Sequence, residues 1–197
     1  MVSSVDSEAM ARWEPNAQGR LAEAALELFA ERGYEQTTVA DIAERAGLTK
    51  RTFFRYYADK REVLFGAGTE FQDLIVEGAT GAAPDAAPLD VVAAGLRAGV
   101  DMLEGRRAFA RRRASVISAN PELQERELIK MASVAKALAQ VLRDRGIAEP
   151  EASLTAEAGV AAFRIAFERW AQGEDLRDLP ELTRASLAAL RALSSAA

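Results

Sequence analysis

Thr38 to Tyr57 reads TVADIAERAGLTKRTFFRYY, and this stretch decides the fold of the chain. Thr38 and Thr49 each precede a run with helical spacing of apolar residues, which predicts two short helices capped by threonine hydroxyls. Gly47 permits the turn between them, and Ala43 is small enough to lie where two helices cross. The stretch therefore predicts a helix-turn-helix.

The second of these helices has two chemically different faces. At about 3.6 residues per turn, Phe53 and Tyr57 share its inner face. Its outer face carries side chains that bind phosphates and base edges, and these are Arg51, Thr52, Arg55 and Tyr56, with Lys50 at the helix N-terminus. The alternative is a small helical pair with a solvated cationic face. We predict that residues 50–57 form a recognition helix for double-stranded DNA.

Composition and charge narrow the function further. The chain of 197 residues has a net charge of −5, yet six cations lie between Arg45 and Arg61, so its basic surface is local. It contains no cysteine and no histidine, which excludes disulfides, thiolate nucleophiles and the commonest metal ligands. No cofactor or metal site is expected, and no catalytic motif is present. We predict a protein that is not an enzyme, although an enzyme with a vestigial helix-turn-helix and a structural interaction module remain alternatives.

The rest of the chain reads as helix, so the predicted fold is all-α with about nine helices. Asp59 and Glu62 resemble a capping box that opens a fourth, longer helix. Further helices are expected at about residues 89–104, 105–119, 121–145, 151–172 and 179–195. The predicted domains are a flexible tail (1–14), a helix-turn-helix domain with three helices (15–75, motif 38–57) and a helical effector-binding and dimerisation domain (76–197). No signal peptide or membrane-spanning run is evident, so we expect a cytoplasmic protein with no membrane partner.

A longer stretch carries a family resemblance. Residues 20–65 read RLAEAALELFAERGYEQTTVADIAERAGLTKRTFFRYYADKREVLF, which resembles the N-terminal domain of the TetR/AcrR regulators. The resemblance implies a homodimer that binds a palindromic operator, and a small molecule that binds the C-terminal domain and alters operator affinity. It implies a ligand-responsive repressor, with an activator or a ligand-independent regulator as alternatives.

The same resemblance assigns positions on the DNA. It places Thr49, Lys50, Arg51, Thr52 and Phe54 near bases, and Thr38, Arg55, Tyr56 and Lys60 near phosphates. The sequence departs from the family pattern at three positions. Ala40 is too short to reach a base, Arg51 replaces a common glycine, and Phe54 replaces a common tyrosine. The operator therefore cannot be copied from a relative.

The helix expected at residues 151–172 is apolar on two faces and needs covering on both. One face carries aromatic side chains together with Val160, and the other carries small and aliphatic side chains. Together with the last helix, the aliphatic face suggests a four-helix dimer interface formed by Leu154, Ala158, Ala161, Ala162, Ile165, Leu179, Leu182, Leu190 and Leu193. Burial of the whole helix inside a monomer is the alternative, and the sequence leaves open which face meets a partner.

The C-terminal domain also offers candidate ligand contacts. An apolar pocket for an unidentified, largely apolar effector would be lined by Met102, Phe109, Met131, Phe163, Phe167 and Trp170, although such residues are more often core. Five arginines between residues 106 and 113 are expected to be solvated or salt-bridged. The minority interpretation is that one or two of them bind an anionic effector such as an acyl-coenzyme A. Arg12 in the tail is a candidate minor-groove contact, with disorder as the alternative.

Overall fold

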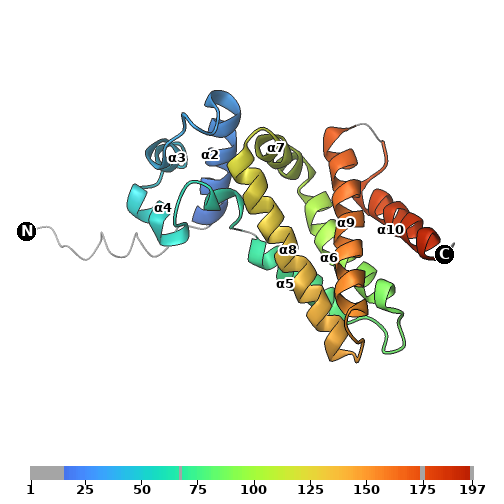
Figure 1. The fold of residues 1–197 in the computed structure, drawn as a ribbon. Coiled ribbons are helices and arrows are strands. Elements are labelled where there is room, and N and C mark those ends of the chain that lie inside the picture. The colour runs from blue at the N-terminus through green and yellow to red at the C-terminus, as the bar shows by residue number, and fades with distance from the viewer. Residues whose placement is uncertain (1–15, 67, 174–175, 196–197) are drawn as a thin grey trace, which may run out of the picture. The chain divides into compact units, whose positions relative to one another are not determined.

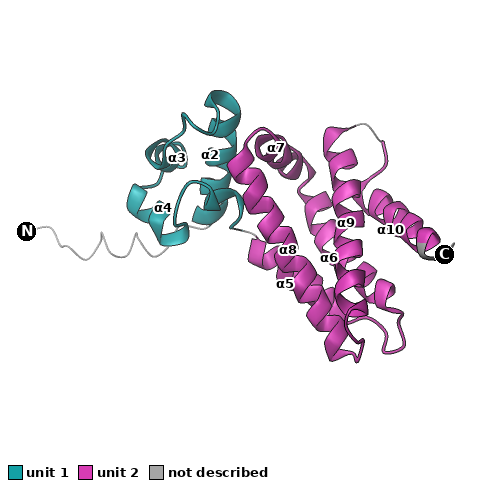
Figure 2. Ribbon diagram, in the orientation of Figure 1, with its two compact units in different colours: residues 1–66 teal, residues 67–197 magenta. Residues whose placement is uncertain are grey.

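The computed structural model describes residues 16–66, 68–173 and 176–195, and in these ranges it contains nine α-helices, one 3-10 turn and no strand (Figure 1). The predicted all-α fold is confirmed. The tail at 1–14, with Arg12, lies outside the described residues. The chain divides into unit 1, residues 1–66, and unit 2, residues 67–197 (Figure 2). The sequence predicted this division at residue 75, but α5 (Gly68–Thr80) packs on α6 (Pro88–Gly105) and so belongs to unit 2.

Unit 1 is built on α2 (Ala17–Arg32), which buries one stripe that includes Leu21, Ala25 and Leu28. The helix ends as the sequence predicts, at Gly33, whose φ of 83° is readily adopted only by a residue without a Cβ. The first short helix of the motif packs on this helix, and the second packs on the first.

The first motif helix, α3 (Val39–Arg45), begins with the predicted cap at Thr38. The Asp41 amide donates to the Thr38 hydroxyl at 3.2 Å, and the Thr38 amide and hydroxyl donate to the Asp41 carboxylate at 2.9 and 2.7 Å. These hydrogen bonds lower the pKa of Asp41. At the other end of α3, Arg45 pairs with Glu27 and Glu31 of α2 at 3.2 and 2.8 Å. Arg45 is thus used within unit 1 and contributes less to a DNA-facing surface than its sequence position suggested.

The turn that follows α3 is held from α2. Gly47 has a φ of 66°, a left-handed conformation that favours glycine. Arg20 donates from Nε to the Ala46 carbonyl at 3.1 Å and covers the turn. Sequence reasoning missed this role of Arg20, because nothing local links residues 26 positions apart.

The helix predicted to open at Asp59 is interrupted. The Asp59 carboxylate accepts hydrogen bonds from the amides of Arg61 and Glu62 at 2.8 and 3.2 Å, but only a 3-10 turn, η1 (Glu62–Leu64), follows. At Gly66 a Cβ would lie 2.5 Å from the Tyr57 ring, so only glycine lets the backbone pass this close to the ring. The prediction of one continuous helix was wrong because the contact with Tyr57 depends on the tertiary fold.

Unit 2 consists of α5, α6, α7 (Arg107–Ser118), α8 (Pro121–Asp144), α9 (Glu151–Gln172) and α10 (Leu179–Ser195). Helices α5 and α6 approach closely through glycines. A Cβ on Gly95 would lie 2.6 Å from the Ile75 carbonyl oxygen. Helix α9 contacts α6, α7, α8 and α10, and its buried residues include Val160, Phe163 and Trp170. None of the helices in the described ranges is long and apolar enough to cross a membrane.

Candidate nucleic-acid interface and effector cavity

The second motif helix, α4 (Lys50–Tyr56), is fixed by its cap and by two aromatic anchors. The Thr52 amide donates to the Thr49 hydroxyl at 3.1 Å. Phe53 is fully buried, and its ring lies 5.5 Å from that of Tyr57, measured between centroids. The Tyr57 hydroxyl donates to the Gln18 carbonyl at 3.3 Å, and burial raises the pKa of Tyr57. The predicted inner face is therefore the observed one.

The opposite face of α4 is open to solvent. Lys50, Arg51 and Arg55 are exposed, Thr52 is half-buried, and Phe54 and Tyr56 have exposed fractions of 56% and 40%. The Arg55 guanidinium lies 4.9 Å from the centroid of the Tyr56 ring and donates to the Tyr56 hydroxyl at 3.1 Å. The face combines guanidinium, ammonium, hydroxyl and aromatic groups, which suits phosphate and base-edge contacts in a DNA groove.

Two of the predicted phosphate contacts have structural partners within unit 1. The Lys60 ammonium donates to the carbonyls of Tyr34 and Thr37 at 2.8 and 3.3 Å and lies 4.2 Å from the centroid of the Tyr34 ring. The Thr38 hydroxyl is engaged in the cap with Asp41. Lys60 thus closes the loop after α2, and its contact with phosphate stays a prediction.

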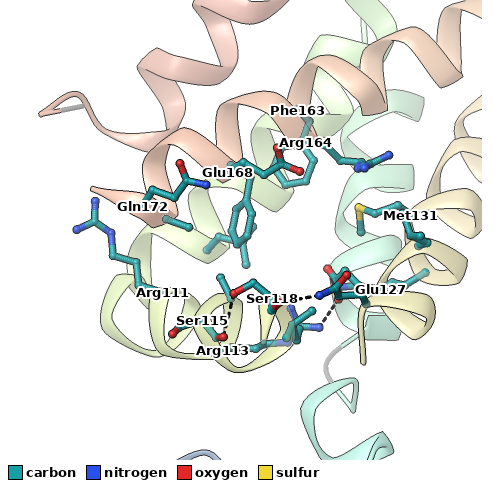
Figure 3. A pocket seen from close by; sticks show the side chains of 18 of the residues that line it. Arg111, Arg113, Ser115, Ser118, Glu127, Met131, Phe163, Arg164, Glu168 and Gln172 are labelled. Atoms are coloured by element: carbon teal, nitrogen blue, oxygen red, sulfur yellow. Dashed lines mark hydrogen bonds and ion pairs between the residues drawn. The ribbon is translucent and has the colours of Figure 1, made fainter. Parts of the chain in front are cut away.

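A cavity of about 620 Å³ lies within unit 2, lined by residues of α5, α6, α7, α8 and α9. Figure 3 shows Arg113, Ser115 and Ser118 of α7 on one side and Phe163, Arg164 and Glu168 of α9 opposite them, with Met131 of α8 at one end. Such a volume is typical of a small-molecule site.

The predicted ligand contacts divide into two groups. Met131, Phe163 and Phe167 line the cavity. Met102, Phe109 and Trp170 are not among its lining residues. Met102 packs against the core, Trp170 is fully buried in it, and the Phe109 ring is covered by the Arg106 guanidinium at 4.7 Å. Helical spacing identified apolar residues correctly but could not separate those that face the cavity from those that fill the core.

The cavity is also more charged than the sequence predicted. Arg113 pairs with Glu127 at 2.5 Å, and the Lys130 ammonium lies 3.9 Å from the other Glu127 oxygen. Burial raises the pKa of Glu127, but the charges of Arg113 and Lys130 outweigh burial and hold that pKa below its usual value. Burial, assisted by Arg113, lowers the pKa of Lys130 to about 8. These charged groups lie at the cavity wall, where a ligand would meet them.

The arginine cluster at residues 106–113 is divided between surface pairs and the cavity. Arg107 pairs with Glu104 on the neighbouring helix, and Arg106 covers Phe109. Arg111 and Arg113 line the cavity, and the Arg111 guanidinium lies 5.0 Å from the centroid of the Trp170 ring. Two arginines of the cluster thus lie at the cavity wall, and binding of an anionic effector by them stays a prediction.

Comparison with known proteins agrees with both units. Residues 21–67 match the model for bacterial regulatory proteins of the tetR family, and residues 86–194 match the model of the MftR C-terminal domain. The chain belongs to the TetR family. Its biochemical class is therefore that of a DNA-binding transcriptional regulator.

Curated relatives of this TetR-family regulator match it over the helix-turn-helix. MftR of Mycobacterium tuberculosis, a regulator named for mycofactocin biosynthesis, is 46% identical over 46 residues, which cover 23% of each protein. TcmR of Streptomyces glaucescens, an HTH-type transcriptional regulator, is 59% identical over 39 residues, which cover 20% of this chain and 17% of TcmR. The matches thus span less than a quarter of either relative's length.

Solved structures share the fold over nearly the whole length. A TetR-family regulator of Syntrophomonas wolfei is 15% identical with a TM-score of 0.69, and the match covers 91% of this chain and 95% of that one. FadR of Bacillus subtilis, in complex with stearoyl-CoA, is 20% identical with a TM-score of 0.63, covering 87% and 96%. These likenesses establish the fold of this regulator.

Helix α9 of this regulator presents one apolar face to solvent. Residues 154, 158, 161 and 165 recur at helical spacing, and Leu154 and Ile165 have exposed fractions of 64% and 56%. Ala162 is buried on the other side, next to the aromatic residues. The aromatic face therefore belongs to the core of unit 2, and the aliphatic face is exposed to solvent.

The last helix changes part of the predicted interface. Leu179 and Leu182 are fully buried within unit 2, because they pack into its core together with α6 and α9. Leu190 is half-buried and Leu193 is 74% exposed. The start of α10 is thus buried within unit 2, and Leu193 near its end is exposed.

Proposed function

We propose that this regulator is a dimeric repressor that binds a palindromic operator through α4 of each protomer and leaves it when a small molecule occupies the cavity of unit 2. The observation that carries the proposal is the open face of α4, held rigidly by the buried Phe53 and Tyr57. A recognition surface must combine exposure with fixed geometry, and α4 has both.

In the proposed complex, Arg51 reaches a base edge, since a guanidinium can pair bidentately with guanine. Thr49, Lys50, Thr52 and Phe54 lie near bases as well, with the Phe54 ring suited to a thymine methyl group. The Arg55–Tyr56 pair meets the phosphates, where the two side chains support each other. Phosphate contacts from Thr38 and Lys60 complete the proposed set.

The proposed dimer forms through the aliphatic face of α9 and the end of α10. Leu154, Ile165 and Leu193 are large apolar side chains that are exposed in one protomer. Burial of their surface provides the association energy. Because the chain is acidic overall, specific binding rests on a small basic surface used twice, on half-sites about 34–36 Å apart.

The proposed effector site is the cavity in unit 2. Two proteins of the same fold, SmeT and the FadR of Bacillus subtilis, are known as complexes with triclosan and stearoyl-CoA respectively. A ligand that prefers one dimer geometry shifts the population toward it, and DNA affinity falls if the recognition helices no longer match the half-sites.

A mobility-shift assay on the DNA flanking the protein's own gene tests the interface. We expect an Arg51→Ala, Arg55→Ala, Tyr56→Ala triple variant to lose binding, and an Arg97→Ala variant, which removes an exposed cation from α6, to retain it. Full retention of binding by the triple variant would refute the assigned interface. In a deletion strain, a repressor predicts increased transcription of adjacent genes, and decreased transcription would identify an activator.

An Ile165→Glu variant tests the dimer. A charge placed at the centre of an apolar interface opposes association, so we expect a monomer in sedimentation velocity and weaker operator binding. An Ile129→Glu variant is the control, because it makes the same substitution at a position on α8 that is 55% exposed and lies outside both the aliphatic face and the cavity. A dimer that withstands Ile165→Glu would place the interface elsewhere.

A further inference from the structure

We propose that the cavity in unit 2 binds an amphipathic monocarboxylate, with the carboxylate between Lys130 and Arg113 and an unbranched apolar tail along the row of phenylalanine rings. This inference rests on the proposed function of the cavity as an effector site and specifies the chemical class of the effector. Its basis is the juxtaposition of a buried excess positive charge with an apolar wall.

Three side chains of α7 and α8 set the charge at the inner cavity wall, and Arg126 of α8, whose charge also acts on Glu127 and Lys130, is not among the lining residues. Arg113, Lys130 and Glu127 have side-chain exposures of 12%, 15% and 25%, so two cations and one carboxylate are largely withdrawn from water. Glu127 is engaged by Arg113 at 2.5 Å, and it lies 3.9 Å from the Lys130 ammonium, beyond direct hydrogen-bond distance. A buried net charge of one sign is costly unless a counter-charge meets it.

The size of the excess indicates the charge of the ligand. One carboxylate would neutralise the excess cation of this cluster. At these three inner side chains, a doubly charged phosphate would replace a buried positive charge with a buried negative one, so they suit a monoanion better. The outer lining residues include Arg111, Arg164 and Glu168, which add one further positive charge nearer to solvent.

The apolar wall begins where the charge cluster ends. The Lys130 ammonium lies 4.6 Å from the centroid of the Phe71 ring. The Phe71 ring is 6.1 Å from that of Phe163, which is in turn 5.9 Å from that of Phe167. All three phenylalanines line the cavity together with Met131. A ligand with its anionic head at Lys130 would thus lay its tail on this row of rings.

The volume agrees with a medium chain. At roughly 30 Å³ for each water-sized group, 620 Å³ accommodates about 20 non-hydrogen atoms. An alkyl carboxylate of medium length fits inside, whereas the nucleotide part of an acyl-coenzyme A would remain outside. An acyl thioester also lacks the free carboxylate that would bind between Lys130 and Arg113, so experiment can distinguish free carboxylates from acyl-coenzyme A thioesters.

Binding to the full-length protein is measured by calorimetry with three probes of equal chain length: dodecanoate, 1-dodecanol and dodecanoyl-coenzyme A. We expect dodecanoate to bind about tenfold to a hundredfold more tightly than the alcohol, the range for a charge-assisted hydrogen bond. The Lys130→Met variant should lose this preference and Lys130→Arg should keep it. Lys136→Met removes an exposed cation from the same helix and should leave the preference unchanged.

Equal binding of the acid and the alcohol by the unaltered protein would overturn the proposal without reference to any variant. Preference for the acid that survives Lys130→Met would also overturn it. Binding of dodecanoyl-coenzyme A alone, with release of the operator, would refute the carboxylate and leave the ligand-responsive repressor intact. Failure of the ligand-free protein to bind any DNA would instead refute the proposed function.

Discussion

Two consecutive phenylalanines on α4 provide a direct test of the division between anchor and recognition surface. Phe53 is fully buried, whereas Phe54 is 56% exposed. The two residues have the same side chain, lie on the same helix and differ only in the direction they face. We expect Phe53→Ala to lower stability and Phe54→Ala to weaken DNA binding.

The expected free energies follow from burial. Truncation of a fully buried phenylalanine costs about 3–5 kcal/mol of unfolding free energy, because a cavity remains. The less exposed part of the Phe54 side chain buries about 90 Å² at most in the folded protein, so its truncation lowers the unfolding free energy by about 2 kcal/mol. The higher helix propensity of alanine offsets about 0.5 kcal/mol of this loss. The Phe53→Ala variant should thus be less stable than Phe54→Ala by about 2–3 kcal/mol.

Urea unfolding followed by circular dichroism measures stability, and fluorescence anisotropy with a duplex selected from a random pool measures DNA affinity. We expect Phe54→Ala to reduce affinity about tenfold, the lower end of the cost of losing a base contact. Phe53→Ala should weaken DNA binding as well, because α4 loses one of the two aromatic anchors that fix its geometry, so the difference in stability is what separates the two variants. Equal loss of stability in both variants, or unchanged affinity of Phe54→Ala, would refute the assigned faces of α4.

Three further predictions concern other parts of the chain. Gly95→Ala should lower the melting temperature in calorimetry by several degrees, because the added Cβ would clash with the Ile75 carbonyl oxygen. Gly105→Ala on the same helix is the control and should be neutral or stabilising, because no atom lies within 4 Å of its added Cβ. Lys130 has a pKa of about 8 in the folded protein and 10.5 in the unfolded chain, so between these pH values the unfolded chain binds more protons. The unfolding free energy should therefore rise by about 3 kcal/mol from pH 8 to pH 10.5. Denaturant titrations of the Lys130→Met variant should lack this rise. Lys60→Met should destabilise unit 1 and should reduce the slope of log DNA affinity against log salt concentration by about 0.9, because one phosphate contact is lost; an unchanged slope would remove Lys60 from the proposed phosphate contacts.

The sequence by itself determined the features that depend on neighbouring residues. The caps at Thr38 and Thr49 and the stop at Gly33 require partners within a few positions, and the structure has each of them as predicted. The inner and outer faces of α4 follow from helical spacing in the same way. Local hydrogen bonds and helix periodicity are encoded over short distances, so the helix-turn-helix could be predicted almost completely.

Tertiary structure decided the rest. Helix α9 has two apolar faces, and only packing showed that the aromatic face is internal and the face with Ile165 is open. The partners of Lys60 and Arg20 lie more than 20 positions away, so no local pattern could assign them. The buried charge cluster around Lys130 arises where α7 and α8 meet α5, and burial depends on neighbours that the chain acquires only on folding.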